Sequence, residues 1–205
     1  MIPIFISGPH GCGKSSLIKD LVSENESYIK DDYSIDFVND LPTVSKMTIY
    51  EKCLLRLYHR FYTAEQALMK CKTENNKEIL IIDRSIYDSV VYNNVEMQLH
   101  NFTEKQYENL NEISKCALEL LDPYVIILNP SENEVTEYLR MRTESGTRKK
   151  RDKLCSREDT PDYIHMMNIE YNKINGKKIL MVDNNKEDGK RKIYEWIESN
   201  ILKDK

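Results

Sequence analysis

The sequence lacks any long hydrophobic run and has little glycine, with six glycines and one tryptophan among 205 residues. No apolar stretch approaches the roughly 20 residues that a membrane-spanning helix requires. The apolar start of the chain, Ile2 to Ile6, is too short for a signal peptide and is interrupted by Pro3. We therefore expect a cytoplasmic protein with no membrane partner.

The sequence also lacks a C-x-x-C pair and any excess of basic charge. Its five cysteines are an odd number, which favours reduced thiols in a cytosol-like compartment. Lys and Arg number 30 against 34 Asp and Glu, whereas a general nucleic-acid-binding protein is usually strongly basic, so no nucleic-acid partner is expected. The length predicts a single domain of residues 1–205 that needs no disulfide or structural metal.

Short apolar runs alternate with helical patterns along the chain. Runs rich in Ile, Leu and Val are typical of strands that are buried on both faces, as in a parallel sheet. Strands that alternate with helices predict an α/β fold. The expected strands are Ile2–Ile6, Tyr28–Lys30, Glu78–Ile82, Tyr124–Leu128 and Lys178–Val182, and the expected helices are 15–24, 46–72, 86–98, 103–121, 132–143, 161–174 and 189–202.

Two features of these helices can be predicted in more detail. Thr103 with Gln106, and Ser131 with Glu134, match capping boxes at helix N-termini. The helix 46–72 has apolar residues at steps of three and four, which predicts a stripe that packs in the core. The stripe consists of Met47, Tyr50, Leu54, Leu57, Phe61, Ala64 and Leu68.

The strongest motif follows the first expected strand. Residues 8–15, GPHGCGKS, fit the P-loop pattern G-x-x-x-x-G-K-[ST] and lie between an expected strand and an expected helix. The glycines let successive backbone N–H groups bind phosphate oxygens, and the next helix adds its positive N-terminus. Lys14 can reach the β- and γ-phosphates and Ser15 can bind Mg²⁺. The residues expected to bind ATP are Gly8, His10, Gly11, Cys12, Gly13, Lys14, Ser15 and Ser16.

Two other classes of P-loop protein fit less well. The residues N-K-E-D at 185–188 match the guanine-binding pattern of GTPases, but too few residues follow for a further strand and base-binding loop. A loop near the adenine and a plain turn are the two remaining interpretations of 183–188. Motor and transporter ATPases carry paired acidic residues after four apolar ones, whereas the run 79–82 is followed by D-R-S.

This D-R-S segment, Asp83 to Ser85, is the second informative motif. An acidic residue at a strand end beside a P-loop can hold Mg²⁺, usually through water. The neighbouring Arg84 supplies a fixed cation near a transferred phosphoryl group. We therefore expect a metal site at Ser15 and Asp83 and a catalytic role for Arg84, the alternative being a salt bridge at the strand end.

With these motifs, the sequence resembles deoxyribonucleoside kinases and thymidylate kinases. Residues 82–88, IDRSIYD, are similar to the E-R-S-V-Y-S-D segment of the first family and to the D-R-Y segment of the second. Segments 128–142 and 157–171 are similar to the regions before and after the lid of these kinases. The resemblance extends over most of the chain. It implies a P-loop kinase fold, with a five-stranded parallel sheet of order 2-3-1-4-5, helices on both faces and an arginine-rich lid.

The resemblance favours one of the two families by a small margin. Gly11, His10 and Ser85 are typical of deoxyribonucleoside kinases, whereas Asp83 and Ser89 are typical of thymidylate kinases. We expect transfer of the ATP γ-phosphate to the 5′-hydroxyl of a (deoxy)ribonucleoside. The alternatives are a thymidylate-kinase-like nucleoside monophosphate kinase and a nucleotide-binding module without turnover. The expected partner is a nucleoside or nucleoside monophosphate substrate, with a homodimer as an open option.

A nucleoside acceptor requires a general base. Its 5′-hydroxyl has a very high pKa, so a carboxylate must accept the proton during phosphoryl transfer. Deoxyribonucleoside kinases place a glutamate at the end of the second strand, and the matching segment here ends in two aspartates. Asp32 is the expected base, followed by Asp31 and then Asp36, with a solvated acidic turn as the alternative. A monophosphate acceptor would not need this base.

A charged segment at 142–160 has no apolar period. A basic run is usually a solvated face, a localisation signal or a nucleic-acid patch. The resemblance implies a lid at about 144–160 instead, whose arginines close over ATP and exclude water. It assigns catalytic roles to Arg151 and Arg157 and ATP binding to Arg148. The acceptor base is expected beneath the helix 46–72, where the candidates are Arg56, His59, Arg60 and Tyr62, with Tyr50 or Phe61 as stacking partners.

Overall fold

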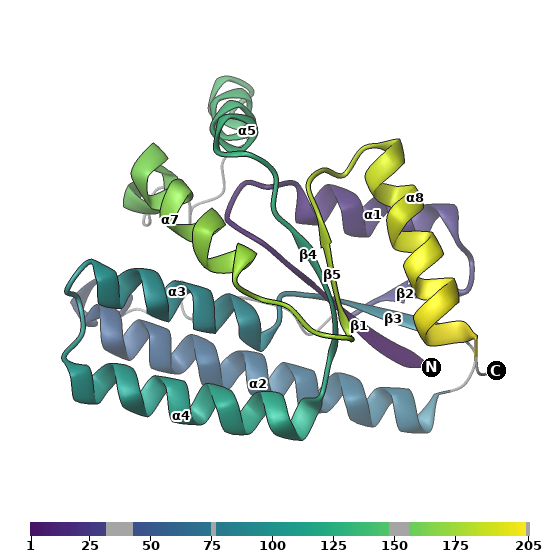
Figure 1. Ribbon diagram of the computed structural model, residues 1–205, viewed down its shortest axis with the longest axis horizontal. Helices are drawn as coiled ribbons and strands as arrows, with labels where there is room; N and C mark the ends of the chain where they lie inside the picture. Colours follow the sequence, from purple (N-terminus) through teal and green to yellow (C-terminus); the bar gives the residue numbers. More distant parts are fainter. Residues whose placement is uncertain (32–42, 75–76, 148–155, 204–205) are drawn as a thin grey trace.

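The structure of the protein is a computed structural model, and it describes residues 1–31, 43–74, 77–147 and 156–203. Its centre is a parallel sheet of five strands in the order β2-β3-β1-β4-β5 (Figure 1). This order confirms the predicted fold class. Within the described ranges, no helix has the length and apolar character to cross a membrane. The strands are β1 (Ile2–Ser7), β2 (Tyr28–Lys30), β3 (Ile79–Asp83), β4 (Tyr124–Leu128) and β5 (Ile179–Val182).

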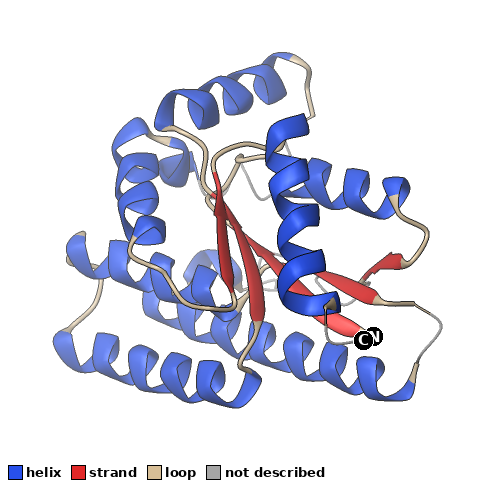
Figure 2. Ribbon diagram, turned by 45° about the vertical axis from the view of Figure 1, so that its right-hand side comes forward, coloured by secondary structure: helices blue, strands red, loops and turns tan. Residues whose placement is uncertain are grey.

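The strands are apolar because helices cover both faces of the sheet. Side chains alternate between the faces along each strand, so Leu80 and Ile82 lie in one core cluster while Ile79 and Ile81 lie in the other. Helices α2, α3 and α4 pack on the first face, and α1 and α8 pack on the second (Figures 1 and 2). The helices are α1 (Lys14–Glu24), α2 (Ile49–Thr73), α3 (Ile86–Gln98), α4 (Glu104–Leu121), α5 (Glu132–Glu144), α7 (Pro161–Asn172) and α8 (Glu187–Ile197).

The register of the central strands positions the functional segments. Ile6 of β1 pairs with Asp83 of β3 on one side and with Ile126 of β4 on the other. Because the strands are parallel, their carboxyl ends lie at one edge of the sheet. The P-loop after β1 and the D-R-S segment after β3 are therefore neighbours, although they are far apart in the sequence.

Capping boxes fix the start of four helices. The two predicted boxes, at Thr103 and Ser131, are confirmed. Two further boxes begin α2 and α3, at Thr48 and at Ser85. The box at Thr48 explains why α2 begins later than the apolar pattern predicted. An Ncap side chain that binds the N3 amide satisfies a backbone donor which would otherwise lack a partner.

The buried face of α2 differs in part from the predicted stripe. Leu57 and Ala64 are buried as expected, but Tyr50, Leu54, Phe61 and Leu68 are only partly buried. The most buried positions also include Cys53, Ala67 and Cys71. These residues follow the same helical period, but the buried face is rotated about the helix axis relative to the predicted stripe. The reason is that α2 packs against α3, α4 and the sheet at once.

Candidate active site

The P-loop, residues 8–15, is packed tightly between neighbouring loops. Gly8 has a φ of 144°, and a Cβ there would lie 2.1 Å from the carbonyl oxygen of Leu128 at the end of β4. Gly13 has a φ of 96°, and a Cβ there would lie 2.8 Å from Nδ2 of Asn185. Both positions favour glycine because of their positive φ, and at Gly8 a side chain would also meet the backbone at the end of β4. The contact with Asn185 brings the segment 183–188 against the P-loop.

Helix α1 begins with an N-terminus that suits an anion. It starts at Lys14 with no side-chain cap and no acidic residue in its first turn. The positive end of the helix is therefore not offset by its own side chains. Ser15 and Ser16 lie exposed in this first turn, while Cys12 in the loop is buried.

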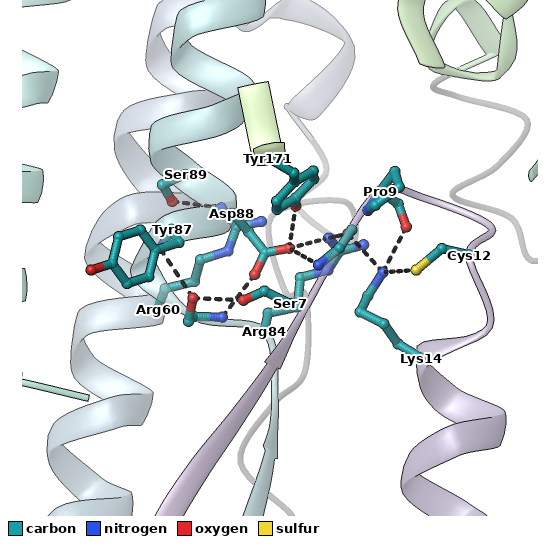
Figure 3. Close-up of polar contacts among 12 residues, drawn as sticks. Ser7, Pro9, Cys12, Lys14, Arg60, Arg84, Tyr87, Asp88, Ser89 and Tyr171 are labelled. Carbon is teal, nitrogen blue, oxygen red and sulfur yellow. Dashed lines mark hydrogen bonds and ion pairs between the residues drawn. The ribbon is translucent and has the colours of Figure 1, made fainter. Parts of the chain in front are cut away.

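The Lys14 ammonium is buried against the backbone of its own loop. Its Nζ donates to the carbonyl oxygens of Gly8 at 2.8 Å and Pro9 at 2.7 Å, and lies 3.5 Å from Sγ of Cys12 (Figure 3). Burial, and then the positive charge of Arg84, lower the pKa of Lys14. A buried cation of this kind is stabilised by an anionic partner, and phosphate is such a partner.

Arg84 connects the turn after β3 to the P-loop. Its backbone N–H donates to the carbonyl oxygen of Ile6 at 2.9 Å. Its φ of 81° is in the left-handed region, which costs a residue with a side chain about 1–2 kcal/mol. The guanidinium Nη1 lies 2.9 Å from Oδ1 of Asp88 and 3.4 Å from the carbonyl oxygen of Gly8. The cation is thus held beside the P-loop.

Asp88 is the most connected side chain at this edge of the sheet. Besides binding Arg84, its carboxylate accepts from the backbone N–H of Ser85 at 2.9 Å, from the Tyr171 hydroxyl at 2.8 Å and from the backbone N–H of Gly8 at 3.4 Å (Figure 3). It therefore joins β1, α3 and α7. We refer to this set as the Asp88 network, and it comprises Ser7, Gly8, Arg84, Ser85, Asp88 and Tyr171, with Oγ of Ser7 lying 2.6 Å from Oγ of Ser85.

The Asp88 carboxylate is ionised although it is fully buried. Burial alone would raise the pKa of Asp88, but Arg84, Arg60 and Lys14 together lower it to about 2. Sequence analysis missed this residue as part of the site. The available signal was the pattern S-x-x-D at 85–88, which marks a capping box and gives no indication of the long-range partners.

Asp83 is suited to bind a metal ion through its carboxylate. Its Oδ1 is buried and has no hydrogen-bond partner among the described residues. A carboxylate oxygen and a serine hydroxyl are ligands that Mg²⁺ prefers. Asp83 at the end of β3 and Ser15 at the start of α1 therefore fit the predicted ion, which would neutralise charge on nucleotide phosphates when bound.

A recess opens between α2 and α3, next to the Asp88 network. Its empty volume, open to solvent, is about 240 Å³. Arg60 of α2 donates to Oγ of Ser89 on α3 at 2.5 Å, which bridges the two helices. Burial raises the pKa of Cys53 to about 12, so this thiol stays protonated. The recess is lined by Cys53, Arg56, Arg60, Ser89, Tyr92 and Asn93.

A second buried carboxylate of α3, Glu96, binds the C-terminal part of the predicted lid and the start of α7. Arg157 forms an ion pair with Glu96, and the Tyr163 hydroxyl donates to the same oxygen at 2.9 Å. Burial would lower the pKa of Arg157, but Glu96 raises it. Glu158 beside it is buried, and its Oε2 has no hydrogen-bond partner within the described ranges.

His10 of the P-loop also lies close to the C-terminal part of the predicted lid. Its Nε2 lies 3.7 Å from Oδ1 of Asp159. Several other predicted residues lie outside the described residues, namely Asp32, Asp36, Arg148 and Arg151, as do residues 148–155 of the predicted lid. Asp31 is described and buried at the end of β2, where its backbone N–H donates to the carbonyl oxygen of Ile81 at 2.8 Å.

A family model described as "AAA domain" matches residues 3–132, which is more than half of the chain. The chain belongs to the AAA domain family. The matched region of this AAA domain protein contains the P-loop, Arg84, Asp88 and the lining of the recess. No curated protein matches the sequence.

Solved structures that resemble this AAA domain protein cover almost the whole chain. A deoxyadenosine kinase from M. mycoides with bound dATP is 16% identical, with a TM-score of 0.66, and the match covers 96% of this chain and 97% of that one. A thymidylate kinase from Candida albicans is 19% identical, with a TM-score of 0.63 and coverage of 97% and 92%. These similarities confirm the P-loop kinase fold that the sequence motifs predicted.

We predict that Asp88→Asn destabilises the protein most strongly near neutral pH. A pKa lowered from 3.8 to about 2 corresponds to about 2–3 kcal/mol of unfolding free energy. Because the pKa is lower in the folded state, this stabilisation is present above pH 4 and is lost as the pH falls towards 2. Urea unfolding of both proteins between pH 7 and pH 2.5 measures it. If the difference in unfolding free energy between the two proteins stays constant or grows in acid, Asp88 is not ionised in the folded protein.

Proposed function

We propose that the protein is an ATP-dependent kinase that transfers the γ-phosphate to the 5′-hydroxyl of a (deoxy)ribonucleoside. The observation that carries the proposal is the adjacency of two sites along α3. Asp88 binds the arginine that touches the P-loop, and the next residue, Ser89, lines the recess. A phosphate-binding loop and a recess lined by polar side chains thus lie side by side. Residues 1–205 would form one catalytic domain, with 144–160 as its lid.

The phosphate site has the charges that phosphoryl transfer requires. Negative charge spreads over the equatorial oxygens in the transition state, so catalysis depends mainly on positioned cations. Lys14 is buried at the P-loop, Arg84 is partly buried beside it, and both would contact the transferred group. Mg²⁺ held by Ser15 and Asp83 would neutralise the donor phosphates. Arg148, Arg151 and Arg157 would close over ATP from the lid, with Arg157 guided by its pairing with Glu96.

The acceptor hydroxyl would lose its proton to an aspartate at the end of β2. Asp32 is our proposed base, and Asp31 is the alternative that lies in the described part of the chain. Asp31 ends a strand that pairs with β3, so it lies at the same edge of the sheet as Asp83. A carboxylate at this edge would accept the proton of the acceptor hydroxyl during transfer.

A nucleoside monophosphate acceptor is the second candidate. It is favoured by one observation, namely the two arginines, Arg56 and Arg60, in the lining of the recess. Guanidinium groups bind phosphate well because their donors match its oxygens. Such an acceptor is already ionised and would require no general base. The third candidate function is a nucleotide-binding module without turnover. The absence of ADP release in the presence of acceptor would identify this function.

We predict that Lys14→Ala lowers kcat/KM for ATP by about 30–1,000-fold, the loss expected for one preorganised charge donor. The matched control is Lys19→Ala, because Lys19 lies exposed on the same helix. That control should retain the activity of the unmodified protein. Coupled measurement of ADP release checks both variants. Near-normal turnover by Lys14→Ala would show that the P-loop is not the site of transfer.

The general base separates the two kinase proposals. With a nucleoside acceptor, Asp32→Asn should lower kcat by about 10²–10⁴-fold, the contribution of a positioned base. If Asp31 is the base, Asp31→Asn shows that loss instead. With a monophosphate acceptor both variants should remain active, and Arg60→Ala should raise the acceptor KM. Turnover of deoxynucleoside monophosphates, but of no nucleoside, would overturn the nucleoside proposal.

A further inference from the structure

Tyr171 of α7 is a fully buried residue whose hydroxyl contacts the phosphate site. The residue is 0% exposed, and its hydroxyl donates to Oδ1 of Asp88 at 2.8 Å (Figure 3). Burial, and then the negative charge of Asp88, raise the pKa of Tyr171. The hydroxyl therefore keeps its proton and acts as a hydrogen-bond donor to the carboxylate.

Tyr171 and Arg84 bind the same oxygen atom. Nη1 of Arg84 lies 2.9 Å from Oδ1 of Asp88, the atom that also accepts from Tyr171. The backbone N–H of Gly8 is a weaker third contact of this oxygen, at 3.4 Å. The other oxygen, Oδ2, accepts from the backbone N–H of Ser85 at 2.9 Å. The carboxylate is thus held at Oδ2 by the start of α3 and at Oδ1 by α7, and without the hydroxyl it would lose its tie to α7.

The orientation of Arg84 matters because a second cation lies beside it. Lys14 and Arg84 both approach the carbonyl oxygen of Gly8, with Nζ at 2.8 Å and Nη1 at 3.4 Å. Two cations at one oxygen repel each other, and the buried charge of Asp88 offsets that repulsion. The direction in which Arg84 presents its guanidinium is therefore set by its bond to Asp88.

Other bonds hold α7 on α3 independently of Tyr171. Eight residues earlier, the Tyr163 hydroxyl donates to Oε1 of Glu96 at 2.9 Å. Directly before Tyr171, the buried carboxylate of Glu170 accepts from the Asn94 amide at 2.9 Å. These bonds keep the helix in place when the Tyr171 hydroxyl alone is removed, so the effect of that removal is confined to the phosphate site.

We propose, on the basis of the proposed function, that Tyr171 is a positioning residue for phosphoryl transfer. Its hydroxyl holds Arg84, through Asp88, at the place where charge develops on the transferred group. Cations stabilise a transition state best when they are already in place, and a misplacement of about 1 Å costs roughly 100-fold in rate. The catalytic effect of Arg84 thus depends on a hydroxyl from α7, a helix that lies far along the chain from the P-loop.

Tyr171→Phe removes the hydroxyl and keeps the buried ring. We expect kcat to fall by about 10–100-fold with an unchanged KM for ATP, because the affected interaction is made with the transition state. The matched control is Tyr107→Phe, since the Tyr107 hydroxyl donates to Oδ1 of Asn94, also on α3, at 2.8 Å. That control should keep its kcat. Equal losses of kcat in both variants, or full activity of Tyr171→Phe, would overturn the inference.

A double-mutant cycle with Arg84→Gly distinguishes positioning from a structural role. Glycine adopts the left-handed conformation of residue 84 freely, so this variant removes the cation without straining the turn. If Tyr171 acts through Arg84, Tyr171→Phe should change kcat by less than about 2-fold once Arg84 is absent. The same large loss with and without Arg84 would show that Tyr171 is a structural residue and that the inference is wrong.

The two proposals can fail separately. If the protein phosphorylates no nucleoside or monophosphate, the proposed function is wrong, and NMR of the Arg84 guanidinium nitrogens decides the inference without turnover. Arg84→Gly identifies the signals of this group, which are separate when the guanidinium is held and averaged when it rotates. Separate signals in the unmodified protein that merge in Tyr171→Phe would support positioning of Arg84 by Tyr171. Averaged signals in the unmodified protein, or the same separate signals in both proteins, would overturn it.

Discussion

The ionised carboxylate of Asp88 is the interaction on which the site depends. It is fully buried, and such a charge is tolerated only when it is paired and hydrogen-bonded. Arg84 provides the charge, while the amides of Gly8 and Ser85 and the hydroxyl of Tyr171 provide hydrogen bonds. Through these contacts a single side chain fixes the start of the P-loop, the turn after β3 and helix α7. The buried Lys14 gains from the same negative charge.

Asp88 has a counterpart on the same helix. Glu96 also binds one arginine and one tyrosine, Arg157 and Tyr163. Along α3 and α7 the partners run in opposite order, since Asp88 meets Tyr171 while Glu96 meets Tyr163. Two carboxylate–tyrosine bonds therefore align these antiparallel helices. The first bond lies on the P-loop side of the molecule, and the second lies beside Arg157 in the C-terminal part of the predicted lid.

The elements that could be predicted from the sequence are those with local signals. The sheet, the P-loop and the capping boxes at Thr103 and Ser131 follow from periodicity, spacing or motif, because their residues lie close together in the chain. The partners of Asp88 and Glu96 could not be predicted, since they lie on other elements and meet only once the sheet is assembled. The burial of Asn93 has no sequence signal either, because asparagine in a helix usually faces solvent or marks an end.

The backbone at Arg84 has a consequence for the order of folding events. Its left-handed conformation is unfavourable in isolation, and its compensating bonds go to Ile6 and Asp88. The bond to Ile6 exists only after β1 and β3 have paired across the long intervening segment, a contact that is slow to form. We therefore expect this turn to adopt its native shape late, after the sheet. A newly made chain would acquire its compact core first and its ability to bind phosphate last.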